Sequence, residues 1–340
     1  MPNDDPGGLP PAQTIRQLTS APWVAQALWA AASLGIADHL AAGPRTPEQL
    51  AAASGTLPRP LYRVLRALAS LGIFAERPDG RLENTPASET LRADVPGSTR
   101  DYVIFFGQTW HIQSHAELLY SMRTGKPAAE RVLGKPLWDF FAEDVEQARI
   151  FNAAMTSIIT DTAAAVRDAY DFGAVRTLVD VGGGHGMLLG TVVAANASLR
   201  GVLFDQPQVV EGAGPTLERL GVRGRVTIVG GDFFQEVPRG DAYLLSHIIH
   251  DWDDERSTAI LRTIHANAEP GARVLLVESV IPPGNAFSFG KLLDLEMLCL
   301  PGGLERTEAE YRELLRVSGF RLERVLATRS PAHIIESVRV

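Results

Sequence analysis

The sequence predicts an α/β protein with a mostly parallel sheet of seven strands in its C-terminal half, preceded by a helical domain. Short apolar runs rich in β-branched residues alternate with helical segments from residue 175 onward, a glycine-rich turn follows the first run, and apolar residues recur at helical spacing over 12–95. The last two strand-like runs are joined by three residues only, too few for a parallel crossover, so this pair is predicted to be antiparallel.

The composition limits the classes of function. The 340 residues are 45% hydrophobic and 21% charged, and the net charge is −8. An acidic chain argues against nucleic acid as the main partner, and no apolar stretch is long enough to predict a membrane span. The first residues are acidic and turn-rich, unlike a signal peptide, so a cytoplasmic protein is expected. The single cysteine, Cys299, argues against a disulfide framework and a thiolate zinc site.

Residues 1–10 are expected to form a flexible tail and residues 11–95 a helical domain. Thr46 and Gln49 around Pro47 have the pattern of a helix start, with the threonine as N-cap. The next helix carries an apolar stripe and is expected to end at Gly72. Two short β-prone runs beyond it predict a hairpin around Asp79-Gly80. The apolar stripe consists of Leu61, Val64, Leu65, Leu68 and Leu71.

This order of helices and hairpin resembles a winged helix, which leaves a DNA-binding regulator as an alternative function. Arg59, Arg63 and Arg66 on the second helix could contact phosphate. The hairpin over residues 73–84 is acidic, however, whereas a wing that reads a groove is expected to be basic. DNA binding is therefore the less favoured interpretation.

A strand-like run at 177–181 ends in a turn that contains Gly182, Gly184 and Gly186. Because glycine has no Cβ atom, a ligand can lie close to such a backbone, at the N-terminus of the helix expected from residue 187. Asp205 ends the next strand-like run, where a carboxylate can accept two hydrogen bonds from a ribose diol. The turn therefore predicts a nucleotide-containing ligand.

The spacing of these glycines does not match the dinucleotide fingerprint Gly-x-Gly-x-x-Gly/Ala. Starting from Gly182 its last position is Met187, and starting from Gly184 it is Leu189. Beginning at Asp180, the acid-x-Gly-x-Gly-x-Gly spacing instead resembles motif I of class I methyltransferases, which bind S-adenosylmethionine.

Six segments together resemble the caffeic-acid/acetylserotonin-type O-methyltransferases, in their bacterial natural-product branch. The resemblance covers nearly the whole chain. It implies a Rossmann-like class I methyltransferase sheet over 173–340, a winged-helix-like dimerisation domain that makes a homodimer, and a helical linker over 96–172 that contributes to the acceptor pocket. The cofactor would be S-adenosylmethionine and the product S-adenosylhomocysteine. The segments are 151–155, 180–186, 204–207, 231–234, 250–255 and 301–307.

The expected catalytic residues are His250, Glu278 and Glu305. A phenol has an unperturbed pKa near 10, so its methylation at neutral pH benefits from a base. His250 follows the strand-like run 241–247 at the carboxyl edge of a parallel sheet, where ligands bind. The resemblance implies that both glutamates flank and orient its imidazole. A helix-capping role near Thr307 is the alternative for Glu305.

The resemblance also implies the residues that bind cofactor and acceptor. Ser246 and His247 stand where plant members carry lysine and tryptophan, and Ile158 and Leu300 replace polar residues of plant phenylpropanoid enzymes, so caffeic acid itself is not the expected substrate. Core packing is the alternative role for Phe151 and Met155. The cofactor residues are Asp180, Gly182, Gly184, Asp205, Gln206, Asp232, Phe233, Ser246 and His247. The acceptor residues are Phe106, Trp110, His111, Phe151, Asn152, Met155, Ile158, Glu296 and Leu300.

An acidic cluster at 251–255 could suggest a metal site. Acidic residues in front of a helix are favoured by its dipole, and no calcium-loop spacing is present, so no metal is expected. The sequence thus predicts methyl transfer to a hydroxyl, preferably phenolic, of a small aromatic or polyketide secondary metabolite. The alternative is a family member whose chemistry has diverged to S-adenosylmethionine-assisted hydroxylation, decarboxylation or C-methylation.

Overall fold

The computed structural model describes residues 10–340, and the chain divides into two compact units, residues 1–108 and 109–340. Apart from Pro10, the expected tail 1–10 lies outside the described residues. Among the described residues no helix is long and apolar enough to cross a membrane.

The first unit is mainly helical and contains the predicted hairpin. Strand β1 pairs with β2 in antiparallel register, with Ala75 opposite Glu83. The elements are α1 (Pro11–Thr19), α2 (Ala21–Ser33), α3 (Ile36–His39), α4 (Pro47–Ser54), α5 (Pro58–Ala69), β1 (Phe74–Glu76), β2 (Leu82–Asn84), α6 (Pro86–Glu89) and α7 (Arg100–Phe106).

The helix cap and the apolar stripe predicted for this unit agree with the structure, except at one residue of the stripe. Thr46 caps α4 through a reciprocal capping box with Gln49. Leu61, Leu65 and Leu68 are buried on one face of α5, as the apolar stripe predicts. Leu71, predicted to continue this stripe, is 54% exposed, so the prediction is wrong for that residue. The helix has already ended at Ala69, and helical spacing no longer applies beyond it.

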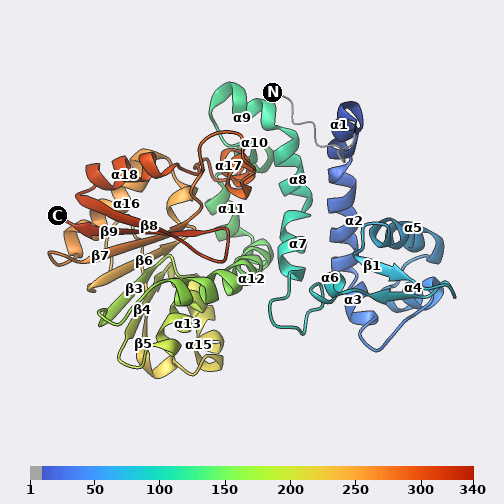
Figure 1. Cartoon of the computed structure of the whole chain (residues 1–340), viewed down its shortest axis with the longest axis horizontal. Helices are drawn as coiled ribbons and strands as arrows, with labels where there is room; N and C mark the ends of the chain where they lie inside the picture. Colours follow the sequence, from blue (N-terminus) through green and yellow to red (C-terminus); the bar gives the residue numbers. More distant parts are fainter. Residues whose placement is uncertain (1–9) are drawn as a thin grey trace. The chain divides into compact units, whose positions relative to one another are not determined.

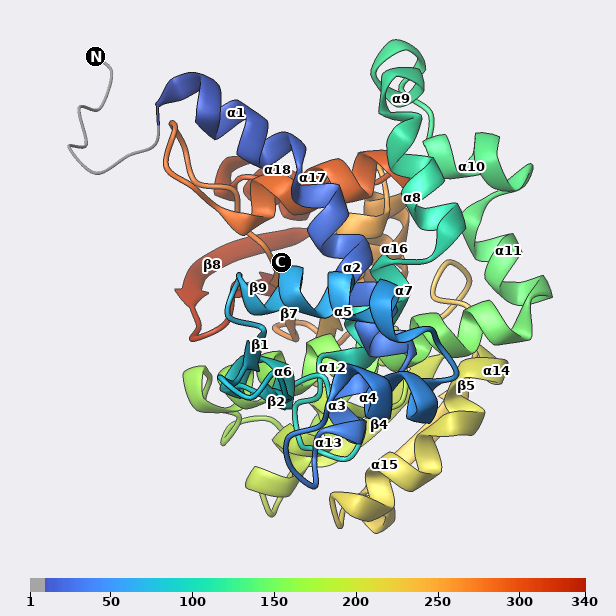
Figure 2. The same cartoon turned by 90° about the vertical axis from the view of Figure 1, so that its right-hand side faces the viewer.

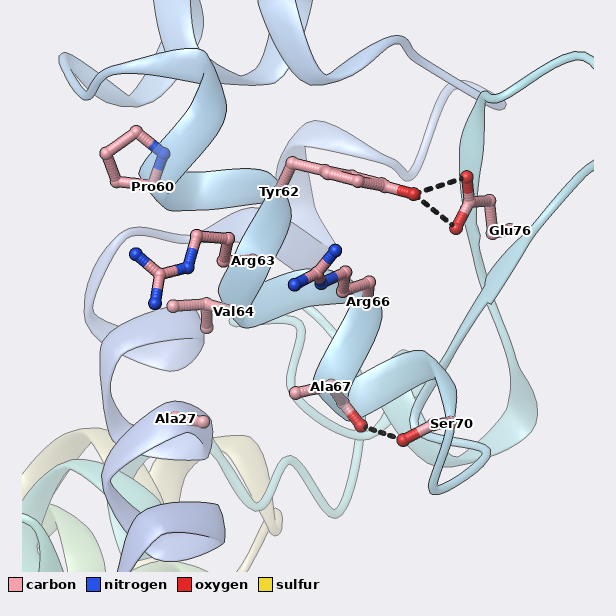
Figure 3. A pocket seen from close by; sticks show the side chains of 9 residues that line it. All are labelled: Ala27, Pro60, Tyr62, Arg63, Val64, Arg66, Ala67, Ser70 and Glu76. Atoms are coloured by element: carbon pink, nitrogen blue, oxygen red, sulfur yellow. Dashed lines mark hydrogen bonds between the residues drawn. The ribbon is translucent and has the colours of Figure 1, made fainter.

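The outer surfaces of α1 and α2 expose large apolar side chains. Trp23 on α2 is 76% exposed, and Ile15 and Leu18 on α1 are exposed as well. A pocket of about 770 Å³ lies between α2, α5 and β1 (Figure 3). In this pocket the Tyr62 hydroxyl donates to the Glu76 carboxylate, which ties α5 to the hairpin.

The second unit begins with five helices and continues as the seven-stranded sheet. The sheet order is β5-β4-β3-β6-β7-β9-β8, parallel except for β9, which runs antiparallel to both neighbours. The predicted seven strands and antiparallel last pair are confirmed. The helices are α8 (Thr109–Ala116), α9 (Leu118–Thr124), α10 (Ala128–Leu133), α11 (Leu137–Glu143) and α12 (Val145–Ala169); the strands are β3 (Thr177–Val181), β4 (Arg200–Asp205), β5 (Val226–Gly230), β6 (Ala242–Ser246), β7 (Arg273–Glu278), β8 (Phe320–Ala327) and β9 (His333–Arg339).

Helices cover both faces of this sheet (Figures 1 and 2), and an apolar core lies on each face. One core joins the sheet to α12, α13 (Met187–Ala195) and α15 (Gly214–Arg219), with α14 (Pro207–Val210) beside β4 and β5. The other joins it to α16 (Asp254–Asn267) and α18 (Glu308–Val317). A further helix, α17 (Phe289–Cys299), packs against α8, α9 and α10.

One predicted helix is absent. The sequence pattern predicts helices in each of the first five gaps between strands, but residues 231–241 between β5 and β6 contain only turns, a bend and chain without regular secondary structure. The Asp232 carboxylate accepts the N–H of Phe234 and fixes a turn, and Pro238 and Gly240 then disfavour a helix. The segment instead carries Phe233 and Phe234 past the carboxyl ends of the strands.

The strand order reverses between β3 and β6, because the chain first builds β4 and β5 on one side and then returns to the other. At such a reversal the loops after the two central strands diverge and leave a crevice at their carboxyl ends. The glycine turn follows β3 and the segment with His250 follows β6, so both lie at this point.

Candidate functional site

The glycine turn after β3 has the backbone conformation that its sequence predicts. Gly182, Gly184 and Gly186 all have positive φ, of 72°, 56° and 76°. A Cβ atom on Gly182 would lie 2.4 Å from the Ile248 side chain, whereas one on Gly184 would meet no atom within 4 Å. The turn is therefore tightly packed on its inner side and open over Gly184.

Two carboxyl groups line this turn. Asp205 accepts the N–H of Gly184 at 2.8 Å on one oxygen and the N–H of Gln206 at 2.7 Å on the other, so it fixes the turn as well as ending β4. Asp180 is 1% exposed, and its Oδ2 has no hydrogen-bond partner in the structure. Burial, together with the charge of Asp205, raises the pKa of Asp180 to about 7. A cation bound here would relieve the repulsion between the two carboxylates.

The other residues expected at the cofactor site lie after β5 and β6. Asp232 is exposed and Phe233 half-buried on the turn after β5. The ring of Phe233 lies 6.3 Å from that of Trp252, which joins this turn to the segment that carries His250. Ser246 ends β6, and its hydroxyl lies 3.2 Å from Nδ1 of His247.

His247 combines an unusual backbone with a half-buried side chain. Its φ of 54° is the only positive value of a non-glycine residue among residues 10–340. Burial, with a smaller effect of His250, lowers the pKa of His247 to about 3, so its ring is neutral. Local strain of this kind occurs at functional sites when surrounding contacts enforce it. No pattern in the sequence predicts this conformation.

His250 lies on a short 3₁₀ helix (Ile249–Asp251) directly after β6 and is buried. Its Nδ1 lies 2.7 Å from Oε1 of Glu305 and 3.7 Å from Oε2 of Glu278. Glu278 ends β7, and its Oε1 accepts the N–H groups of Ile248 and Ile249 at 3.0 and 2.9 Å. The three expected catalytic residues thus come from three separate segments and meet around one imidazole.

Asp251 is a fourth side chain in the group around the His250 imidazole, and it was not among the catalytic residues expected from the sequence. The sequence pattern assigns it to the dipole of the following helix, but that helix begins at Asp254 with Asp253 as its N-cap. Asp251 is instead turned toward His250, with its Oδ1 3.6 Å from Nε2. Burial by itself would lower the pKa of His250, but the carboxylates of Glu278, Asp251 and Glu305 raise it to about 10.

Arg306 fixes the segment that carries His250. Its side chain is fully buried, and its guanidinium donates to the carbonyl oxygens of Ile249 and Trp252, on either side of His250. It also pairs with Asp254 at 2.8 Å. Glu305 and Arg306 are neighbours in the chain, so one residue contacts the imidazole and the next holds its backbone.

Gly303 allows the backbone of residues 301–306 to contact the backbone of residues 249–252, which carries His250. A Cβ atom at Gly303 would lie 2.0 Å from the carbonyl oxygen of His250, and the next residue, Leu304, donates its N–H to that oxygen at 2.9 Å. The backbones of the 301–306 and 249–252 segments are therefore too close for any side chain at this position.

The expected acceptor residues of the second unit fall into two groups. Phe151, Met155 and Ile158 recur at helical spacing and are half-buried on α12. Phe151 stacks on Phe141 at 4.6 Å, and Trp138 bridges from Phe151 to Trp252 beside the His250 segment. Asn152 is half-buried next to Phe151.

The second group lies on α8 and at the end of α17. Trp110 donates its indole N–H to Gln147, and Leu300 is buried one turn after Glu296. Nε2 of His111 lies 2.8 Å from Oε1 of Glu296, and Nε2 of His115 lies 2.6 Å from Oε2. His115 was not among the expected residues. Phe106 lies on α7 and thus belongs to the first unit, unlike the other expected acceptor residues.

Comparison with protein families matches two models to this chain. An O-methyltransferase domain covers residues 115–321, and an O-methyltransferase dimerisation domain covers residues 17–94.

Individual proteins match over nearly the whole chain. The phenazine O-methyltransferase of Lysobacter antibioticus is 42% identical over 98% of both chains. The 8-amino-8-demethylriboflavin N,N-dimethyltransferase of Streptomyces davaonensis is 38% identical over 91% of this chain and 90% of its own. Among solved structures, an O-methyltransferase from neocarzinostatin biosynthesis in complex with S-adenosylmethionine and 2-hydroxy-5-methyl naphthoic acid has a TM-score of 0.79 at 32% identity, over 93% of this chain and 96% of its own.

The packing of Arg306 leads to a prediction about stability. Arg306→Met removes the charged hydrogen bonds to the carbonyl oxygens of Ile249 and Trp252, each of which is worth about 1.5–3 kcal/mol. We expect the free energy of unfolding to fall by at least about 2 kcal/mol, measured as a shift of the urea unfolding midpoint. Arg312→Met is the matched control, because Arg312 is 55% exposed in a surface pair and should change stability by about 0.5 kcal/mol or less. Equal shifts for both variants would contradict the role of Arg306.

Proposed function

Because this chain belongs to the O-methyltransferase family and is an S-adenosylmethionine-dependent methyltransferase, we propose that it methylates a hydroxyl group, phenolic in the preferred case, of a small aromatic or polyketide secondary metabolite. The observation that carries the proposal is the buried imidazole of His250, whose Nδ1 is held by Glu305. His250 follows β6, and β6 is the neighbour of β3, the strand that leads into the glycine turn.

The residues at the glycine turn fit the cofactor. When bound, S-adenosylmethionine supplies a methyl group on a positively charged sulfonium, which reacts by in-line displacement. Its positive charge suits a turn lined by Asp180 and Asp205, of which Asp180 has an unpartnered buried oxygen. The open side of Gly184 allows close approach to the backbone. Asp205 still has acceptor capacity for ribose hydroxyls, because each carboxylate oxygen can accept two hydrogen bonds.

His250 is the proposed general base. In the neutral imidazole, the hydrogen bond to Glu305 fixes the proton on Nδ1 and leaves Nε2 as the acceptor. The acceptor hydroxyl would pass its proton to Nε2 while its oxygen takes the methyl group. Glu305, Glu278 and Asp251 then stabilise the imidazolium that forms. Removing the proton at this point makes the oxygen a better nucleophile without free hydroxide.

An aromatic acceptor is supported by the side chains between α12 and the His250 segment. Phe141, Phe151, Trp138 and Trp252 form a continuous series of ring contacts. Aromatic surfaces of this kind suit flat ligands. The O-methyltransferase from neocarzinostatin biosynthesis binds 2-hydroxy-5-methyl naphthoic acid, a hydroxylated aromatic ligand of the same chemical class.

Methyl transfer to nitrogen is the second candidate. The relative from Streptomyces davaonensis is named as an N,N-dimethyltransferase, so a similar chain can carry that activity. The buried carboxylates around His250 favour oxygen, because a phenol must lose its proton to react well whereas a neutral aromatic amine need not.

We also propose that the protein is a homodimer built through the first unit. The dimerisation model covers residues 17–94, and the exposed side chains of Leu18 on α1 and Trp23 on α2 lie at the start of that region. An exposed face of this kind is typical of an interface between subunits.

The first prediction of this mechanism concerns cofactor binding. Asp205→Ala removes a charged hydrogen-bond acceptor, which is worth about 1.5–3 kcal/mol, so the affinity for S-adenosylmethionine should fall at least about tenfold in calorimetry. Asp171→Ala, an exposed aspartate in front of β3, is the control and should bind normally. Unchanged affinity in Asp205→Ala would remove this residue from the cofactor site.

The second prediction separates binding from chemistry. His250→Ala should bind S-adenosylmethionine like the wild type, while turnover falls by roughly 10²–10⁴, the usual share of a general base. Turnover is measured by mass spectrometry with a panel of phenols, aromatic polyketides and aromatic amines. If the wild-type protein methylates only the amines of this panel, the proposed specificity for hydroxyl groups is wrong. Persisting turnover on the phenols would mean that His250 is not the base.

The pH profile gives a further check on this mechanism. Because the pKa of His250 is raised to about 10, the fraction of neutral imidazole grows with pH, and kcat/KM should rise toward that pH. Glu305→Gln removes one of the charges that raise this pKa, so the rise should move to lower pH. Glu313→Gln, in an exposed pair with Arg316, should leave the profile unchanged. A profile unaffected by Glu305→Gln would contradict the pairing with His250.

The last prediction here concerns the dimer. Light scattering should give a mass of about twice the chain mass of 36.7 kDa at micromolar concentration. Trp23→Glu places a charge on the exposed face of α2 and should shift the protein toward the monomer. Leu119→Glu is the matched control on α9, where the leucine is 60% exposed, and should remain dimeric. A monomeric wild type would contradict the proposal.

A further inference from the structure

A second cluster of titratable side chains lies in the same unit as His250 but is built from other residues. His111 and His115 on α8 face Glu296 on α17, with the Nε2 atoms 2.8 and 2.6 Å from its two oxygens. One ligand atom from each residue lies within 4.8 Å of the others. His111 is buried, and the side chains of Glu296 and His115 are 12% and 35% exposed. His111 and Glu296 are also among the expected acceptor residues, but the proton transfer proposed at His250 uses none of these three side chains.

The residue types and their spacing are those of a transition-metal site. His111 and His115 are four residues apart, so both imidazoles lie on one face of the helix in successive turns. Two histidines at this spacing on a helix are a recognised zinc-binding pattern. With one glutamate from elsewhere they make the two-histidine, one-carboxylate set that binds zinc with a fourth position open. One carboxylate also offsets part of the charge of a divalent ion.

The observed distances are compatible with an ion between these groups. Ligand atoms about 2.0–2.2 Å from zinc in tetrahedral geometry lie roughly 3.3–3.6 Å apart. The separations of 2.6 and 2.8 Å therefore need to open by less than about 1 Å, which small side-chain rotations provide.

We propose that His111, His115 and Glu296 bind a divalent transition-metal ion of the zinc class, with the fourth coordination position open to water or another oxygen donor. The partly exposed His115 is the side from which the ion enters. The proposal does not depend on the function proposed above, and the metal is not assigned a part in the methyl transfer.

The cluster around His250 is the competing location, because His250, Glu278 and Glu305 also lie within 4.8 Å of one another. There, however, one oxygen of Glu278 already accepts two backbone N–H groups, and the nearest imidazole atom to both glutamates is Nδ1. The cluster around His250 offers a single imidazole, and one oxygen each of Glu278 and Glu305 is already hydrogen-bonded, whereas two imidazoles face the two oxygens of Glu296. The geometry thus favours the cluster on α8 and α17.

The test is metal binding by the full-length protein, prepared without an affinity tag and freed of metal with a chelator. Titration calorimetry with Zn²⁺ alone should give one equivalent per chain. Glu296→Gln, which keeps the size of the side chain, and His115→Ala should each weaken binding at least about tenfold, because each removes one of three protein ligands. Co²⁺ added to the wild type should give the visible absorption of a four-coordinate site and lose it when Zn²⁺ is added.

Two matched histidine variants make the result specific. His265→Ala, on α16, and His250→Ala should both keep one equivalent of Zn²⁺ with wild-type affinity. If the wild type binds no stoichiometric Zn²⁺, the proposal is wrong. It is equally wrong if Glu296→Gln and His115→Ala bind like the wild type, or if His250→Ala loses the ion, since the metal would then lie elsewhere.

Discussion

The structure around the candidate site depends on one constraint: several charged groups are buried together. His250, Glu278, Glu305 and Arg306 are all at most 6% exposed, in a protein interior where an unpaired charge costs several kcal/mol. Their mutual contacts offset that cost. Because the partners come from the ends of β6 and β7 and from the segment before α18, the loops at this edge of the sheet are fixed relative to one another.

At the glycine turn, in contrast to the paired charges around His250, the nearby charged groups are carboxyl groups. Asp180 and Asp205 place two carboxyl groups beside the same backbone, and burial raises the pKa of both. Burial also lowers the pKa of the neighbouring His185, so its imidazole adds no positive charge at neutral pH. At the site around His250, the positive charges of His250 and Arg306 offset the carboxylates of Glu278 and Glu305. The carboxyl groups at the turn are instead suited to a cation that a bound ligand supplies. We propose a positively charged methyl donor at the turn and a proton acceptor at His250, and both places lie where the strand order reverses.

The helices before the sheet add aromatic surface to this edge. The rings from Phe141 to Trp252 lead from α11 and α12 to the His250 segment. Within the same helical region, His111, His115 and Glu296 form a polar cluster between α8 and α17. A flat acceptor is thus expected to contact mostly carbon, with a few polar groups to fix its orientation.

The sequence by itself determined the features that depend on neighbouring residues. The strands, the capping box at Thr46, the glycine turn and the antiparallel last pair all follow from local periodicity, turn chemistry or connection length. Only the tertiary structure decided which distant residues meet. Asp251 became a neighbour of His250 instead of a helix-dipole acid, residues 231–241 crossed without a helix, and Arg306 was buried under the His250 segment. His115 pairs with a glutamate 181 residues away. Contacts over such separations are set by how the layers pack, and no local pattern in the chain specifies them.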